Sequence, residues 1–223
     1  VYSRAAVGVG APEVTVEVHV GGGLPRVSLV GLPQTAVRES KDRVKAALLN
    51  AGFRFPDGLV TISLAPADLP KEGGRFDLPI ALGILAASGQ VADRRFGEIE
   101  FVGELSLGGG LNPVRGVLPV AIQSGRSGRE LVVPAADGPE AALARDARCF
   151  GADSLLAVVA WLDGKQRLPP RTRLQRRQTE PLVDRRDHGN GRPGVFLDES
   201  AAIDPPGEGD QMTDPEGADQ LFY

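Results

Sequence analysis

A polar loop between two apolar segments carries the residues best suited to chemistry. Residues 66–77 follow an alternating segment and precede a run that is apolar nearly all round. The loop combines charged side chains with residues that bend the backbone: Pro66, Asp68, Lys71, Glu72, Gly73, Gly74, Arg75 and Asp77. The glycine pair permits a tight turn or the close approach of a partner. We interpret the loop either as an interaction surface or as a connection whose charges bond locally to hold the turn.

A basic stripe lies on the helix that we predict over residues 34–51. Arg38, Lys41 and Lys45 recur at spacings of three and four residues, which places them on one side of a helix. Each could neutralise one phosphate of a nucleic-acid backbone, so the stripe is a candidate DNA contact. The alternative is that these side chains form only the solvated side of the helix.

Nucleotide and metal sites are not indicated by the sequence. The G-x-x-x-x-G-K-[ST] pattern of a phosphate-binding loop occurs nowhere, and no strand–GxGxxG–helix unit is present. His19 and His188 have no second His or Cys at ligand spacing, and we expect Cys149 to be a buried small apolar group. We therefore predict no catalytic, cofactor-binding or metal-binding residue in this chain.

Composition limits the remaining classes of protein. The net charge of −4 argues against a broadly basic nucleic-acid binder, although a local basic patch is compatible with it. No apolar run is long enough to span a membrane, and the single cysteine suits a reducing compartment. We expect a cytoplasmic protein without membrane contacts.

The elements that position these residues follow from apolar periodicity. Alternation predicts strands at residues 3–9, 13–20, 26–30, 59–64, 99–102, 130–133 and 148–150. Helices are predicted at residues 34–51, 77–88, 117–124, 139–145 and 154–162, with Asp77 and Ser154 as N-caps. The glycine-rich residues 103–116 predict a tight hairpin. The predicted fold class is α/β (α+β), with helices packed on a mixed sheet.

The character of the sequence changes after about Leu168. Residues 165–192 contain nine Lys and Arg against three acids, whereas residues 193–223 contain eight acids and no Lys or Arg. No apolar period survives there, and such a segment cannot bury enough surface to offset its ordering entropy. We predict one domain over residues 1–168 and a disordered charged tail over residues 169–223.

Two motifs resemble the proteolytic domain of the Lon proteases. They are PKEGG at residues 70–74 and FVGELSLGGGLNPV at residues 101–114. The resemblance implies a Lon-type fold, of the ribosomal-protein-like domain 2 class, in which a Lys activates a Ser at a helix start. Asp77 stands roughly at the Ser position and Leu118 at the Lys position, so both halves of that dyad are absent. We expect the fold without the peptidase activity.

Four longer blocks are similar to the N-terminal domain of the magnesium-chelatase-like AAA+ ATPases of the ComM/YifB type. They are TVEVHVGGGLP, VGLPQTAVRESKDRVKAALLNAGF, LAPADLPKEGGRFDLPIALGILAASGQV and GELSLGGGLNPVRGVLP. The resemblance implies hexameric rings that drive DNA branch migration during recombination in natural transformation. It also implies an AAA+ domain after Leu168, where the charged segment stands instead. ATP and magnesium are therefore implied for full-length members only, and we expect a truncation, a disrupted frame or one piece of a split gene.

These observations lead to three hypotheses of different kinds. The first is a non-catalytic assembly domain that contacts an AAA+ ATPase domain or subunit, DNA, or further copies of itself. The second is a degenerate peptidase that pairs Asp68 or Asp77 with Lys71. The third, raised by the family name alone, is a fragment of an ATPase that inserts a metal into a porphyrin. The first hypothesis predicts that this chain alone is not an enzyme.

Overall fold

The computed structural model describes residues 1–30 and 35–171, without the side chains of residues 36–38. These residues belong to the first of two units into which the chain divides, Val1–Gln178. The predicted tail from residue 172 onward lies outside the described residues, as does the Gly31–Gln34 connection. All further statements concern the described part of the first unit.

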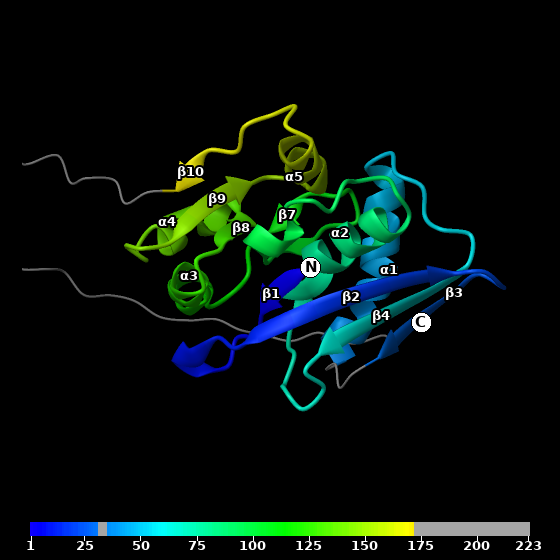
Figure 1. Ribbon diagram of the computed structural model, residues 1–223, viewed down its shortest axis with the longest axis horizontal. Coiled ribbons are helices and arrows are strands. Elements are labelled where there is room, and N and C mark those ends of the chain that lie inside the picture. Colours follow the sequence, from blue (N-terminus) through cyan, green and yellow to red (C-terminus); the bar gives the residue numbers. More distant parts are fainter. Residues whose placement is uncertain (31–34, 172–223) are drawn as a thin grey trace, which may run out of the picture. The chain divides into compact units, whose positions relative to one another are not determined.

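Strands and helices alternate along most of the chain, as the periodicity predicts (Figure 1). The strands are β1 (Tyr2–Arg4), β2 (Glu13–Gly21), β3 (Arg26–Val30), β4 (Leu59–Ala65), β5 (Ile99–Phe101), β6 (Glu104–Leu105), β7 (Leu111–Asn112), β8 (Glu130–Pro134), β9 (Arg148–Ala152) and β10 (Pro170–Arg171). The α-helices are α1 (Thr35–Asn50), α2 (Asp77–Ala87), α3 (Val117–Arg126), α4 (Gly138–Ala141) and α5 (Leu155–Leu162). The predicted α+β class is confirmed.

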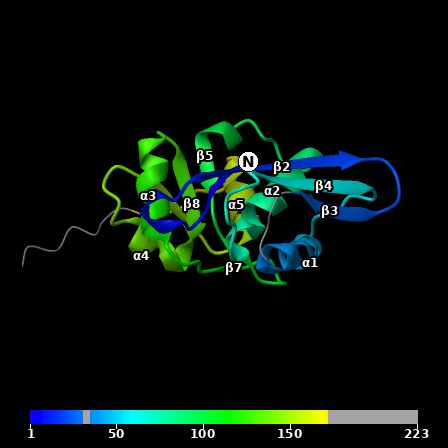
Figure 2. The same cartoon turned by 90° about the horizontal axis from the view of Figure 1, so that it is seen from below.

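Eight of the ten described strands form one mixed sheet in the order β10-β9-β8-β5-β1-β2-β4-β3. The pairs β1–β5, β5–β8, β8–β9 and β3–β4 are parallel, and β1–β2, β2–β4 and β9–β10 are antiparallel. The predicted glycine-rich hairpin is the separate pair β6–β7. Figures 1 and 2 show β2, β4 and β3 running away from β8 and β9 as an arm.

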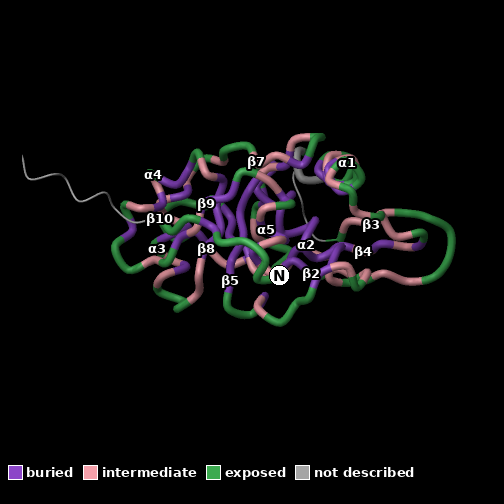
Figure 3. Tube along the Cα trace, turned by 90° about the horizontal axis from the view of Figure 1, so that it is seen from above, coloured by how far each residue is buried: buried purple, intermediate pink, exposed green. Residues whose placement is uncertain are grey.

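The two halves of the sheet are covered differently. Successive residues of β8 point into different cores: Val132 joins α2 and α5, whereas Leu131 and Val133 join α3 and α4. Helices therefore cover both faces of this half. In the arm, alternate residues of β2 such as Val16 face α2, while the opposite face carries polar side chains such as His19. Figure 3 shows the buried segments gathered around α2, α5 and β5.

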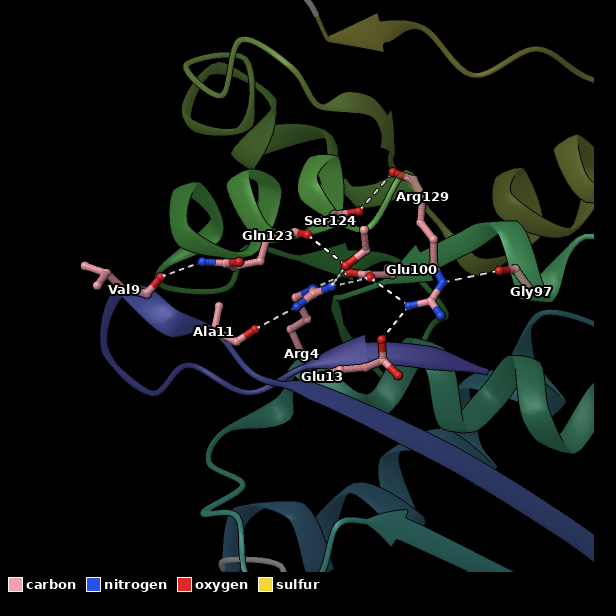
Figure 4. Close-up of polar contacts among 10 residues, drawn as sticks. Arg4, Val9, Ala11, Glu13, Gly97, Glu100, Gln123, Ser124 and Arg129 are labelled. Atoms are coloured by element: carbon pink, nitrogen blue, oxygen red, sulfur yellow. Dashed lines mark hydrogen bonds and ion pairs between the residues drawn. The ribbon is translucent and has the colours of Figure 1, made fainter.

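A buried ionic network holds the sheet where its two halves meet (Figure 4). Arg4 donates to both carboxylate oxygens of Glu100, at 2.6 and 2.7 Å, and both side chains are almost fully buried. Arg129 donates to Glu100 at 3.3 Å, binds Glu13, and lies over the Tyr2 ring with 3.8 Å from its Cζ to the ring centroid. These contacts link β1, β2 and β5 to the connection that precedes β8. The carboxylate of Glu100 is thus bound by two guanidinium groups.

Several predicted boundaries were wrong. The strand predicted over residues 3–9 stops at Arg4, and Gly8–Gly10 forms a 3₁₀ turn in which Gly8 has φ +54°. The helix predicted over residues 139–145 is the single turn α4. Strand β10, which pairs with β9, lies beyond Leu168, where we placed the end of the domain. Two-residue strands leave too short a pattern for periodicity to detect.

Candidate functional site

The 66–77 loop leaves β4 through a cis Ala65–Pro66 peptide bond and enters α2 through the 3₁₀ turn Gly74–Phe76. Its predicted interaction residues separate into two groups by burial. Pro66, Asp68, Glu72 and Gly73 are exposed. Lys71, Gly74, Arg75 and Asp77 are buried. Only the first group is placed to touch a partner directly.

Lys71 fastens the loop to itself. Its side chain is fully buried, and its Nζ donates to the backbone carbonyls of Leu69, at 2.9 Å, and Pro66. Burial lowers the pKa of Lys71, and the charge of Asp68 opposes that shift. The local bonding that we offered as the alternative role of the loop charges is therefore present at Lys71.

The two glycines of the loop meet separate conformational demands. Gly73 has φ +72° and ψ −179°, a conformation that residues with a Cβ rarely adopt. A Cβ on Gly74 would lie 2.4 to 2.7 Å from the side-chain atoms of Glu104 in β6. The glycine pair therefore allows both a tight turn and a close approach, and the neighbour that approaches is the β6–β7 hairpin.

Asp77 does not cap α2 as predicted. Phe76 occupies the N-cap position without a side-chain hydrogen bond, and Asp77 is the first residue of the helix. Its carboxylate accepts from Arg43 Nε at 3.0 Å and Nη2 at 3.3 Å, and from the Leu105 amide at 3.2 Å. Burial raises the pKa of Asp77 to about 6, although hydrogen bonds from Arg43, Ser40 and Leu105 oppose the shift. Asp77 therefore joins α1, α2 and β6.

Arg75 joins the loop to the glycine-rich segment that follows β5. Its side chain is 5% exposed, and its Nη2 donates to the backbone carbonyl of Arg115. Its own carbonyl accepts from the Gly103 amide at 3.0 Å. Burial lowers the pKa of the Arg75 guanidinium, while the charges of Asp137 and then Glu72 oppose that shift. Arg75 therefore fastens the loop to the glycine-rich residues 103–116.

The structure describes two of the three side chains of the basic stripe. Lys41 and Lys45 are exposed on α1, and the Lys45 ammonium lies 5.3 Å from the centroid of the Phe55 ring. The side chain of Arg38 lies outside the described residues. Sequence reasoning missed Arg43, whose spacing of three and four residues from the buried Ser40 and Ala47 could have indicated that it faces inward.

Comparison of the sequence with known proteins places this chain in a family. Residues 16–137 match the family model described as subunit ChlI of Mg-chelatase. The chain is 51% identical over 174 residues to the competence protein ComM of Haemophilus influenzae, covering 78% of this chain and 34% of ComM. It is 43% identical over 220 residues to the uncharacterised protein YifB of Escherichia coli K12, covering 95% of this chain and 44% of YifB. The chain belongs to this magnesium-chelatase-like family and is of the ComM/YifB type.

The chain and these two relatives differ in length. This ComM/YifB-type chain spans less than half the length of these two relatives. Residues 1–168 make up about three quarters of the chain, so a match that covers 95% of it extends into the charged segment. The match to YifB therefore continues past Leu168.

Within the described part of this ComM/YifB-type chain, Lys71 and Asp77, two of the groups considered for a peptidase dyad, bind other partners, while the exposed Asp68 acts on Lys71 through its charge. Lys71 Nζ binds backbone carbonyls, and the Asp77 carboxylate binds Arg43. Leu118, at the position of the Lon lysine, donates its backbone amide to Glu140 Oε1 at 2.8 Å. Over the same residues, no group of three His, Cys, Asp or Glu is placed to hold a metal ion. None of the helices described has the length and hydropathy that crossing a bilayer requires.

Proposed function

We propose that this chain is a non-catalytic assembly domain of a ComM-type DNA-processing AAA+ machine. It supplies a folded scaffold and an exposed loop rim, Pro66, Asp68, Glu72 and Gly73, that contacts an AAA+ ATPase domain or subunit. The family resemblance implies that such machines move DNA branches during recombination in competent cells. ATP and magnesium belong to the ATPase part of the machine in this proposal.

The observation that carries the proposal is the burial and hydrogen bonding of Asp77. The position that a Lon-type nucleophile would occupy holds a buried carboxylate bound to Arg43 and to a backbone amide. A carboxylate held in this way is a poor acyl acceptor, and Leu118 cannot receive a proton. Contacts that stabilise the scaffold thus occupy the place of the catalytic pair.

A pair of assays tests the absence of catalysis. The purified chain is incubated with unfolded casein and, separately, with a fluorescent fluorophosphonate that labels active-site serines. We expect no new fragments and no labelled protein. Casein cleavage that Lys71→Met abolishes would support the degenerate peptidase instead.

A pull-down tests assembly. The bait is this chain, and the prey is Haemophilus influenzae ComM without the segment that this chain matches. We expect capture that weakens when Asp68 and Glu72 are replaced by lysine, because these charges lie on the exposed rim. Unchanged capture by that variant would remove the loop from the proposed interface.

Direct DNA contact is part of the proposal and has its own test. Lys41 and Lys45 are exposed and could each neutralise a phosphate. A gel-shift titration across salt should show weaker binding and a shallower salt dependence for Lys41→Ala. Porphyrin metal insertion, which the family name raises, would require the ATPase and its partners as well as this chain.

A further inference from the structure

The edge of the sheet at β3 is open in the described part of the chain. Strand β3 pairs there with β4 alone, in parallel register from Arg26 opposite Leu59 to Val30 opposite Ser63. The Arg26 amide donates to Gly58 O at 3.2 Å, so the backbone groups of the alternate residues Val27 and Leu29 point away from β4. An open row of backbone donors and acceptors can pair with another extended chain.

A hollow lies beside this edge, between β3 and α1. It has a volume of about 300 Å³, and its lining includes Val27 of β3, Lys45 and Leu49 of α1, and the segment from Phe55 to Gly58. Leu49 is 51% exposed although it is a large apolar residue. A side chain that points toward α1 from a strand added to β3 would enter this hollow, because Val27 and Leu29 already point to that side.

The charges around the hollow favour the binding of an acidic ligand. Arg26 and Lys45 belong to its lining, are exposed and form no ion pair within the described residues, whereas Asp57 is the one carboxylate in the lining. Lys45 also lies over the Phe55 ring, so one of these cations adjoins an apolar part of the lining. A bulky apolar residue flanked by a carboxylate would meet both features.

We propose that β3 and this hollow form a docking site for an extended acidic peptide of a partner protein. The peptide adds to the sheet beside β3, places one bulky apolar side chain among Val27, Leu49 and Phe55, and sets a carboxylate against Arg26 and Lys45. Backbone pairing favours a peptide over a nucleic acid, which offers no strand to extend the ladder. The site is separate from the 66–77 loop and stands or fails independently of the assembly role proposed for that loop.

Fluorescence anisotropy with a defined probe tests the site. The probe is a fluorescein-labelled ten-residue peptide in which a central phenylalanine is flanked by aspartates that alternate with threonines. We expect saturable binding that N-methylation of alternate peptide amides weakens at least about tenfold, because it removes the hydrogen bonds without removing side chains. Equal binding of the methylated peptide, or no saturable binding of the parent peptide, would overturn the proposal.

Protein variants locate the binding surface. Leu49→Ser should weaken binding, because it removes an apolar side chain from the lining without adding a charge, while Leu156→Ser, at a residue 55% exposed on α5, should leave it unchanged. Lys45→Glu should weaken the aspartate peptide and strengthen a lysine version of the same peptide. Equal effects of the two leucine variants would overturn the proposal, as would the absence of this charge-swap rescue.

Two further measurements test whether a nucleic acid or a second copy of this chain binds this surface instead. A labelled oligothymidine that displaces the peptide and loses affinity in Lys45→Glu would make the hollow a nucleic-acid site. Self-association in analytical ultracentrifugation that Leu49→Ser abolishes would make it a contact between copies of this chain. Either result overturns the peptide proposal. Circular dichroism of each variant confirms that the fold is retained.

Discussion

The guanidinium of Arg43 on α1 donates two hydrogen bonds to the buried carboxylate of Asp77, the first residue of α2. The same carboxylate accepts the Leu105 amide, so one side chain joins two helices and the β6–β7 hairpin. This arrangement puts a structural ion pair at the position that the Lon resemblance assigns roughly to the nucleophile.

Removing Arg43 should destabilise the protein. Arg43→Ala leaves the Asp77 carboxylate buried without its cation, and we expect a loss of about 2–3 kcal/mol in the free energy of unfolding. Urea denaturation measures this loss. The control is Lys165→Ala, whose ion pair with Asp163 has side chains 74% and 25% exposed and should contribute less than about 1 kcal/mol. Equal losses in the two variants would contradict a buried role for the Arg43–Asp77 pair.

Asp77 should make stability depend on pH in a defined direction. Burial raises its pKa from 3.8 to about 6 in the folded protein. Between these values the folded protein retains a proton that the unfolded chain has released, so the Asp77 contribution to stability falls as pH rises from about 4 to about 6. Urea denaturation across this range should show the wild type losing stability relative to Asp77→Asn. A relative gain would mean that Arg43 outweighs burial and lowers the pKa of Asp77.

Lys71 should act on the loop rather than on a substrate. Lys71→Met leaves the carbonyls of Pro66 and Leu69 without their donor, and we expect a loss of about 1–2 kcal/mol. Hydrogen–deuterium exchange in residues 66–73 should become faster, because the ammonium no longer closes the loop. The matched control is Glu72→Gln, at an exposed neighbouring position. Unchanged exchange in Lys71→Met would refute the fastening role.

The network at Glu100 should be costly to break and tolerant of full replacement. Glu100→Ala leaves Arg4 buried without a counter-ion, and we expect a loss of about 3–5 kcal/mol. The double variant Arg4→Met/Glu100→Leu should recover much of that loss, since it removes both charges. Thermal unfolding compares both variants with Arg148→Ala as the control. Arg148 forms an ion pair with Glu130 in which the arginine side chain is largely exposed. A double variant no more stable than Glu100→Ala would argue that the ion pair itself is required.

Local patterns accounted for most of the elements. The predicted strand at residues 26–30 matches β3, and Ser154 caps α5 by accepting from the Ala157 amide at 3.2 Å. Both features depend on residues close together in the chain. The burial of Cys149 was also anticipated, and desolvation raises the pKa of its thiol to about 11. The wrong N-cap at Asp77 shows the limit of such reasoning, because a partner 34 residues away competes for the carboxylate.

By itself the sequence determined the α+β class, the order of nearly all elements and the resemblance to the ComM/YifB family, because periodicity and motifs are properties of neighbouring residues. Only the tertiary structure decided that Lys71, Arg75 and Asp77 turn inward while Asp68 and Glu72 stay exposed. It also decided that β3 lies at a sheet edge beside a hollow. Burial and edge position depend on which distant elements pack together, and a loop sequence does not carry that information.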